Sequence, residues 1–169
     1  MRGFAMVFIM LLALPLKGQE PALVCDSEAH SAFDFWVGTW YVLDREGEHV
    51  GVNEIRKVEG GCMISETYKS VTTPFTGRSL NFLNPDTGKW EQIWVDNQGN
   101  YLHLYGGLQN GVMVMQGDHG NGENRRSDKI SWALLDDGRV RQLWERQKDS
   151  GEWTTIFEGF YVRIPGDKS

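Results

Sequence analysis

The segment of residues 77–107 constrains the fold most, because it alternates three short runs of strand-forming residues with two turn signals. The first signal is the sequence NPDTG at 84–88, and the second is DNQGN at 96–100. Runs of about five to eight residues bounded by Pro, Asn, Asp and Gly are typical of an antiparallel meander. The segment therefore predicts three sequential strands joined by tight turns.

The rest of the chain repeats this pattern. After Trp36, turn signals recur about every ten residues, among them the strong hairpin signal DDG at 136–138, and no helix-length 3.6-residue periodicity is present. The pattern predicts an all-β antiparallel barrel or sandwich in one domain, 19–169, with a short N-terminal helical turn at 28–30. Outside the segment 77–107, which holds three, we expect strands at 39–43, 50–58, 62–71, 112–115, 129–135, 139–146 and 152–164, about ten strands in all.

The N-terminus has the pattern of a secretory signal peptide. Met1 and Arg2 precede an apolar run at 4–16, which has the length of a signal-peptide core and is shorter than the ~20 residues of a membrane span. We expect residues 1–18 to be the signal peptide and the protein to be secreted or periplasmic. A retained N-terminal anchor is the alternative.

The charge balance argues against two classes of partner. The chain has 17 basic and 23 acidic residues, a formal net charge of −6, and loss of the leader removes Arg2 and Lys17 and makes it more negative. Sequence-independent binding to nucleic acid or to anionic membranes needs basic patches. We expect no nucleic-acid partner and no stable membrane insertion, and a monomer or homodimer.

The only two cysteines are Cys25 and Cys62. In a chain bound for an oxidising compartment they predict one disulfide, and they are too few for a cysteine-rich zinc site. Two free buried thiols are the alternative.

An amide between two indoles points to a partly polar cavity. Trp90, Gln92 and Trp94 share one face of a predicted strand, and a buried amide needs hydrogen-bond partners. The alternative is an outward face whose indoles cover a neighbouring strand. The sequence GKWEQIW at 88–94 is echoed by GRVRQLW at 138–144, which indicates that Gln142 and Trp144 face the same cavity from another wall, unless the echo is coincidence.

Three further residues are candidates for contact with a ligand's polar end. Glu66 and Arg78 lie on adjacent predicted strands, where they would form a buried pair if both face inward and a weak surface pair if both face outward. His103 alternates with Tyr101 and Tyr105, so it belongs either to a ligand-facing polar strip, with an axial haem ligand as one variant, or to an exposed strand face. The expected ligand-binding residues are thus Glu66, Arg78, Gln92, Trp94, His103, Gln142 and Trp144.

The sequence FDFWVGTW at 33–40 resembles the opening of a family of bacterial proteins with a lipocalin-like (calycin-type) barrel, a domain of unknown function. Further matching features, which extend the resemblance over about 25–163, are Gly61-Cys62, GRSLNF at 77–82, WEQIWVD at 90–96 and RVRQLW at 139–144. The resemblance implies a single calycin-like barrel with a small, mostly apolar molecule in its mouth or interior.

The resemblance also implies a structural pair and bears on haem. In calycins a Gly-x-Trp on the first strand packs against a late Arg, and here Trp40 and Arg163 are the candidates, through a cation–π contact. Some calycin relatives bind haem through a His near the C-terminus. This chain has no His after His119, which argues against haem.

No catalytic motif stands out. The chain has no G-x-S-x-G, no H-E-x-x-H and no Gly-rich phosphate loop, so we assign no catalytic residue, metal site or cofactor. We expect an exported protein that holds a small hydrophobic or amphipathic molecule. The alternatives are a haem- or NO-binding, nitrobindin-like barrel, an enzyme acting on a small lipophilic substrate, and a carbohydrate-binding sandwich.

Overall fold

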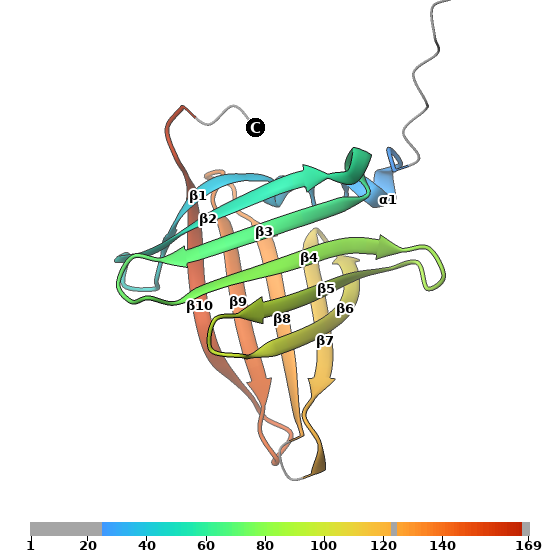
Figure 1. Cartoon of the computed structure of the whole chain (residues 1–169), viewed down its shortest axis with the longest axis vertical. Coiled ribbons are helices and arrows are strands. Elements are labelled where there is room, and N and C mark those ends of the chain that lie inside the picture. The colour runs from blue at the N-terminus through green and yellow to red at the C-terminus, as the bar shows by residue number, and fades with distance from the viewer. Residues whose placement is uncertain (1–24, 123–124, 167–169) are drawn as a thin grey trace, which may run out of the picture.

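Ten antiparallel strands follow one another around a closed barrel in the computed structural model, which describes residues 25–122 and 125–166 (Figure 1). Each strand pairs with its neighbours in sequence, and β1 pairs with β10 to close the barrel. The predicted all-β antiparallel barrel is confirmed. The strands are β1 (Gly38–Leu43), β2 (His49–Val58), β3 (Met63–Ser70), β4 (Thr76–Asn84), β5 (Lys89–Asp96), β6 (Tyr101–Gln109), β7 (Val112–His119), β8 (Arg126–Leu134), β9 (Val140–Gln147) and β10 (Trp153–Arg163).

The turn signals form the tight connections that they predict. Between β4 and β5, Asn84 accepts a hydrogen bond from the N–H of Asp86 on its side chain (2.9 Å) and from that of Gly88 on its backbone carbonyl (2.8 Å). Gly88 has a φ of 64°, and Gly138, in the turn between β8 and β9, has a φ of 83°. Glycine adopts this left-handed conformation without the penalty that a Cβ brings.

An aromatic plug closes one end of the barrel. It comes from the segment before β1, which holds α1 (Glu28–Ser31) and the 3-10 turn η1 (Asp34–Trp36). Phe33 and Trp36 are fully buried and stacked, with ring centroids 4.9 Å apart, and Phe33 packs edge-on against Trp132 of β8 at 5.2 Å. The dense aromatic run at 33–40 therefore fills the barrel end at which α1 lies in Figure 1.

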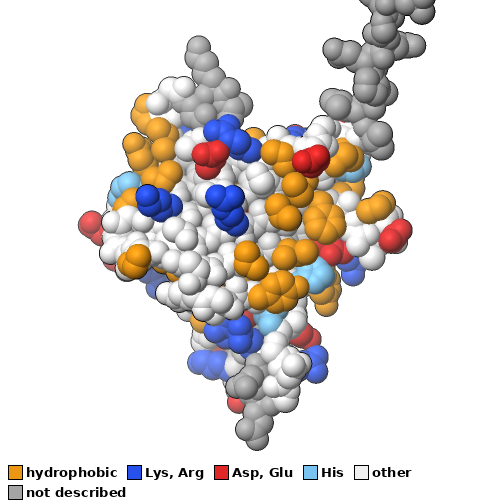
Figure 2. All heavy atoms as spheres, in the orientation of Figure 1, with side chains coloured by type: hydrophobic (Ala, Val, Ile, Leu, Met, Phe, Trp, Pro, Cys, Tyr) orange, Lys and Arg blue, Asp and Glu red, His pale blue; other side chains and the backbone are white. Residues whose placement is uncertain are grey.

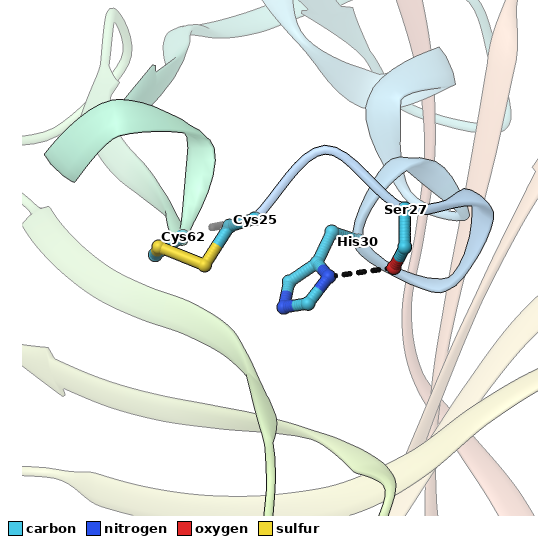
Figure 3. The surroundings of a disulfide bond; sticks show 4 residues. All are labelled: Cys25, Ser27, His30 and Cys62. Carbon is cyan, nitrogen blue, oxygen red and sulfur yellow. Dashed lines mark hydrogen bonds between the residues drawn. A yellow bond between two sulfur atoms is a disulfide. The ribbon is translucent and has the colours of Figure 1, made fainter. Parts of the chain in front are cut away.

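A disulfide ties the start of this plug to the barrel. Cys25 is bonded to Cys62, which follows the 3-10 turn η2 (Glu59–Gly61) and precedes β3 (Figure 3). Ser27 Oγ lies 2.8 Å from His30 Nδ1 within the same N-terminal segment. The predicted disulfide is confirmed, and it holds the plug against the connection between β2 and β3.

Trp40 and Arg163 meet at the plugged end. They are register partners on β1 and β10, and the Arg163 guanidinium lies 4.3 Å from the centre of the Trp40 ring. Arg163 Nη2 also donates a hydrogen bond to the carbonyl of Val37 (3.1 Å). The contact expected between the two residues is present where the first and last strands join.

The predicted signal peptide, residues 1–18, lies outside the described residues. In the part of the chain that the structure describes, no helix is long and apolar enough to cross a membrane.

Candidate functional site

The end of the barrel opposite the plug opens into a cavity of about 670 Å³. Its mouth is bordered by the connections between β1 and β2, β3 and β4, and β5 and β6, and it extends inward to side chains of β3, β5, β9 and β10. This volume lies within the ~300–1,000 Å³ range of small-molecule sites in proteins.

Three aromatic walls of the cavity lie against glycines. A Cβ at Gly51 would overlap the Tyr68 ring, and a Cβ at Gly77 would overlap the Trp94 ring. Likewise, a Cβ at Gly159 would lie 2.6 Å from the ring of Phe157. Because any side chain at these positions would push the rings into the cavity, the glycines set the width of the cavity.

A chain of buried polar side chains crosses the interior at the inner end of the cavity. Asn53 Nδ2 donates to Glu66 Oε1 (2.7 Å) and to the phenol oxygen of Tyr161 (3.3 Å), and Tyr161 donates to Gln142 Oε1. On the other side of Glu66, Ser79 Oγ donates to Glu66 Oε2 (2.6 Å). The chain continues along β4 and β5, where Asn81 Nδ2 donates to Ser79 Oγ (2.9 Å) and Gln92 Nε2 donates to Asn81 Oδ1 (2.9 Å).

Glu66 is the one carboxyl among these hydrogen-bonded polar side chains. It is 6% exposed, and its two oxygens accept hydrogen bonds only from neutral groups, Asn53 and Ser79. Burial raises the pKa of Glu66 from its ordinary value of 4.5 to about 7, and the two hydrogen bonds oppose this shift without cancelling it. Glu66 can therefore hold or release a proton near neutral pH at the wall of a cavity.

Besides Glu66, four of the predicted ligand-binding residues line the cavity. Gln92 and Trp94 project into it from β5, and Gln142 and Trp144 project into it from β9. Trp94 Nε1 donates to Asp96 at the mouth (3.4 Å). The structure places these four side chains on the inner faces of two strands, and their contact with a ligand stays a prediction.

The predicted pair of Glu66 and Arg78 is absent. In the register of β3 and β4, Glu66 lies opposite Ser79, whereas Arg78 lies opposite Thr67 and is exposed on the outer face. Because successive side chains on a strand point to opposite faces, Arg78 and Ser79 cannot both face the cavity. The expectation that Arg78 contacts a ligand in the cavity is therefore wrong, and Ser79 takes its place beside Glu66.

His103 is also on the outer face. Its neighbours in sequence, Leu102 and Leu104, are buried, and its Nε2 lies 2.8 Å from Glu91 Oε2 on the outer face of β5. The expected role of His103 inside the cavity is thus wrong, because the alternation of β6 places Leu102 there instead. Hydrophobic side chains gather over this region in Figure 2, and the exposed ones on β4 to β6 include Leu80, Val95, Tyr101 and Tyr105.

A charged cluster lies behind Trp144, outside the lining of the cavity. Trp144 Nε1 donates to the fully buried carboxylate of Asp128 (2.7 Å), which also accepts a hydrogen bond from Arg146 Nε (3.0 Å). Nε2 of His119, which has no hydrogen-bond partner in the described part of the chain, lies 3.5 Å from Asp128. Burial, the largest cause, lowers the pKa of His119. The cluster fixes the orientation of the Trp144 indole.

The sequence analysis missed several residues of the cavity and of its polar chain. Tyr161 shares the inward face of β10 with Arg163, so the alternation along that strand could have indicated it. Ser79 and Asn81 alternate with Leu80, which is 45% exposed, and this inversion of the usual polar-outward pattern is the signal for a polar interior. The other missed residues include Asn53, Tyr68, Phe75, Leu102, Ile130, Trp132 and Phe157.

Among the described residues, no group of three or more His, Cys, Asp or Glu side chains could hold a metal ion. No protein-family model and no curated protein sequence matches this chain.

Proposed function

We propose that this protein is an exported carrier that holds a small hydrophobic or amphipathic molecule in the barrel cavity. The observation that supports the proposal most is the combination of aromatic walls with a single polar chain at the inner end of a cavity of about 670 Å³. Small-molecule sites typically pair mostly apolar walls with a few polar groups that orient the ligand.

The cavity also offers polar atoms to a ligand. The side chains of Gln92, Gln142 and Tyr161 line it next to Glu66. Trp132 lines it too, and its Nε1 is buried without a hydrogen-bond partner in the described part of the chain. A buried donor without a partner is costly, so a ligand that accepts this hydrogen bond would gain affinity.

The proposal includes export of the protein and its membership of the lipocalin-like family. The apolar run at 4–16 and the disulfide between Cys25 and Cys62 favour a secreted or periplasmic protein. The closed barrel and the Trp40–Arg163 contact favour membership of the lipocalin-like family that the sequence resembles.

Tryptophan fluorescence tests the carrier proposal directly. Titration with a panel of fatty acids, long-chain alcohols, alkylamines and polycyclic aromatics should quench or shift the emission through Trp94 and Trp144. Trp94→Ala should weaken binding at least about tenfold, since truncating a buried aromatic contact at a binding site often costs over 1 kcal/mol. Trp153→Ala is the matched control, because Trp153 lies outside the cavity lining, with its ring 4.4 Å from Lys129 Nζ. The proposal is wrong if no member of the panel binds.

An enzyme acting on a small lipophilic substrate is a second candidate, favoured by one observation. A carboxyl whose pKa is about 7, at the wall of a cavity, is suited to general acid–base catalysis. Turnover of model esters that is lost in Glu66→Gln, with ligand binding retained, would support this candidate.

A further inference from the structure

The charges that face the cavity are all negative. Asp44, Glu66 and Asp96 line it, and none of its lining residues in the described part of the chain is Lys, Arg or His. The whole chain is acidic as well, with a formal net charge of −6. A cleft lined by one sign of charge concentrates ligands of the opposite sign.

The three acids differ in their surroundings. Asp44 and Asp96 each lie at the mouth and accept hydrogen bonds from two backbone N–H groups of their own turns. Their carboxylates therefore already have a structural role. Glu66 lies inside the barrel and takes part in no turn.

Among the described residues, no cationic side chain is paired with Glu66. Its hydrogen-bond donors are the neutral Asn53 and Ser79, and the titratable groups that face it are two phenols, Tyr161 on β10 and Tyr68 on its own strand. Burial raises the pKa of both phenols, so they stay neutral. Beside Glu66, Asn53 Oδ1 is a buried acceptor without a hydrogen-bond partner in the described residues. A carboxylate removed from water is stabilised by a cation, and no cation is supplied by the residues around it.

The aromatic walls of the cavity also favour a cationic ligand. Trp94 and Phe75 lie near one another at the mouth, with ring centroids 6.5 Å apart, and Trp144 lies on another wall. Aromatic faces carry partial negative charge and attract cations, most strongly where water is excluded.

Two arginines near the mouth, in contrast, would attract an anionic ligand. Arg146 and Arg126 lie on the inner faces of β9 and β8, beyond Trp144, and both are directed to the buried carboxylate of Asp128, at 3.0 and 3.6 Å. Neither belongs to the lining of the cavity. Their charge is partly compensated by Asp128, whereas no cationic side chain of the described residues compensates an ionised Glu66.

From these observations we infer that the cavity selects a cationic amine with an apolar body, whose ammonium group pairs with the Glu66 carboxylate. The inference rests on the proposed carrier function and assigns a chemical class to its ligand. The ammonium supplies the missing counter-ion, and the apolar body lies against the aromatic walls.

A matched series of ligands tests the inference. We would measure binding of n-octylamine, 1-octanol and octanoate by isothermal titration calorimetry at pH 8, since the three have eight carbon atoms each and differ mainly in the charge and type of the head group. The amine should bind at least about tenfold more tightly than the alcohol, and the carboxylate should bind most weakly. Glu66→Gln should remove the difference between amine and alcohol.

The wild-type protein provides a second readout that needs no variant. An alkylamine stays protonated between pH 8 and pH 5, so a change in its affinity over this range reports a protonation change in the protein and not in the ligand. Protonation of Glu66 below pH 7 should weaken amine binding up to tenfold per pH unit and should leave 1-octanol without this dependence.

The failure of the inference and that of the carrier proposal are distinguishable. Equal affinity for amine and alcohol, or tightest binding of octanoate, overturns the inference and leaves the carrier proposal standing. The absence of binding in all three titrations, together with no fluorescence response to the wider panel, overturns both.

Discussion

Trp94 and Gly77 are complementary across β4 and β5: the indole lies against the backbone of Gly77, and a Cβ there would overlap the ring. Trp94 is also the wall that stacks loosely with Phe75 at the mouth of the cavity. The glycine therefore determines where a principal wall of the cavity lies.

Gly77→Ala should shift the Trp94 ring and weaken ligand binding. Overpacking of this kind costs about 1–3 kcal/mol of stability, and the displaced ring should narrow the cavity. Urea unfolding, together with titration of a ligand that quenches Trp94, measures both effects. Gly107→Ala is the control, because a Cβ at Gly107 has no atom within 4 Å. Equal affinities for the two variants would show that Gly77 does not set the shape of the cavity.

Glu66 should make the protein less stable as the pH rises toward neutrality. Its pKa is raised from 4.5 to about 7, so the folded protein holds this proton more tightly than the unfolded chain does. The proton on Glu66 contributes at most about 3 kcal/mol to the free energy of unfolding. This contribution is complete below about pH 4.5 and is lost as the pH rises to about 7.

Glu66→Gln isolates this effect, because glutamine does not titrate. The unfolding free energy of the variant, relative to wild type, should rise by up to about 3 kcal/mol between pH 4.5 and 7.5. The change with pH is the quantity to compare, since His119 and the other groups titrate in both proteins. Glu54→Gln, at an exposed position of β2, should show no such trend. A difference that stays constant with pH would contradict the raised pKa of Glu66.

The alternating pattern and the turn residues predict sequential antiparallel strands in a barrel or a sandwich, but some strand ends are misplaced, such as the start of β8, which lies at Arg126 and not at 129. The sequence predicts that β7 ends at Met115, because Gly117 and Asp118 are typical of a loop, but the strand continues to His119. Gly117 is needed there for close packing, since a Cβ would overlap the backbone carbonyl of His103 on β6. A glycine that admits a neighbouring strand and a glycine that forms a turn are not distinguished by the sequence.

The site was predictable only within single strands. That Gln92 and Trp94 share one face follows from alternation along β5, whereas the partner of Glu66 depends on the register between β3 and β4. A register that differs by one residue exchanges Ser79 for Arg78 on the inner face. The hydrogen bond between Asn53 and Tyr161 spans 108 positions and depends on closure of the barrel, which local patterns do not encode.

Removal of the disulfide should loosen the plug. The bond between Cys25 and Cys62 closes a loop with a sequence separation of 37, and the chain-entropy estimate for such a loop is about 4 kcal/mol. Cys25→Ser with Cys62→Ser should lower the melting temperature and speed hydrogen exchange in residues 28–36. Reductant should reproduce the effect in the wild type and leave the double variant unchanged. An unaltered melting temperature in the double variant would contradict this role.

Arg163→Ala should lower the stability of the protein and leave its ligand affinity nearly unchanged. The guanidinium lies 4.3 Å from the centre of the Trp40 ring and donates to the carbonyl of Val37 at 3.1 Å, so its loss should cost about 2 kcal/mol. Ligand affinity should change less than threefold, because Arg163 is at the plugged end and the cavity opens at the other end.

Arg141→Ala is the matched control for Arg163→Ala. Arg141 makes a partly exposed pair with Glu158 at 2.7 Å, and surface pairs of this kind contribute about 1 kcal/mol or less. Urea unfolding should therefore rank Arg163→Ala as the more destabilised variant, and titration with the same ligand should give both variants nearly wild-type affinity. If Arg163→Ala lowered the affinity as much as Trp94→Ala, the plugged end would have to take part in binding. The separation of a structural end from a ligand-binding end would then be wrong.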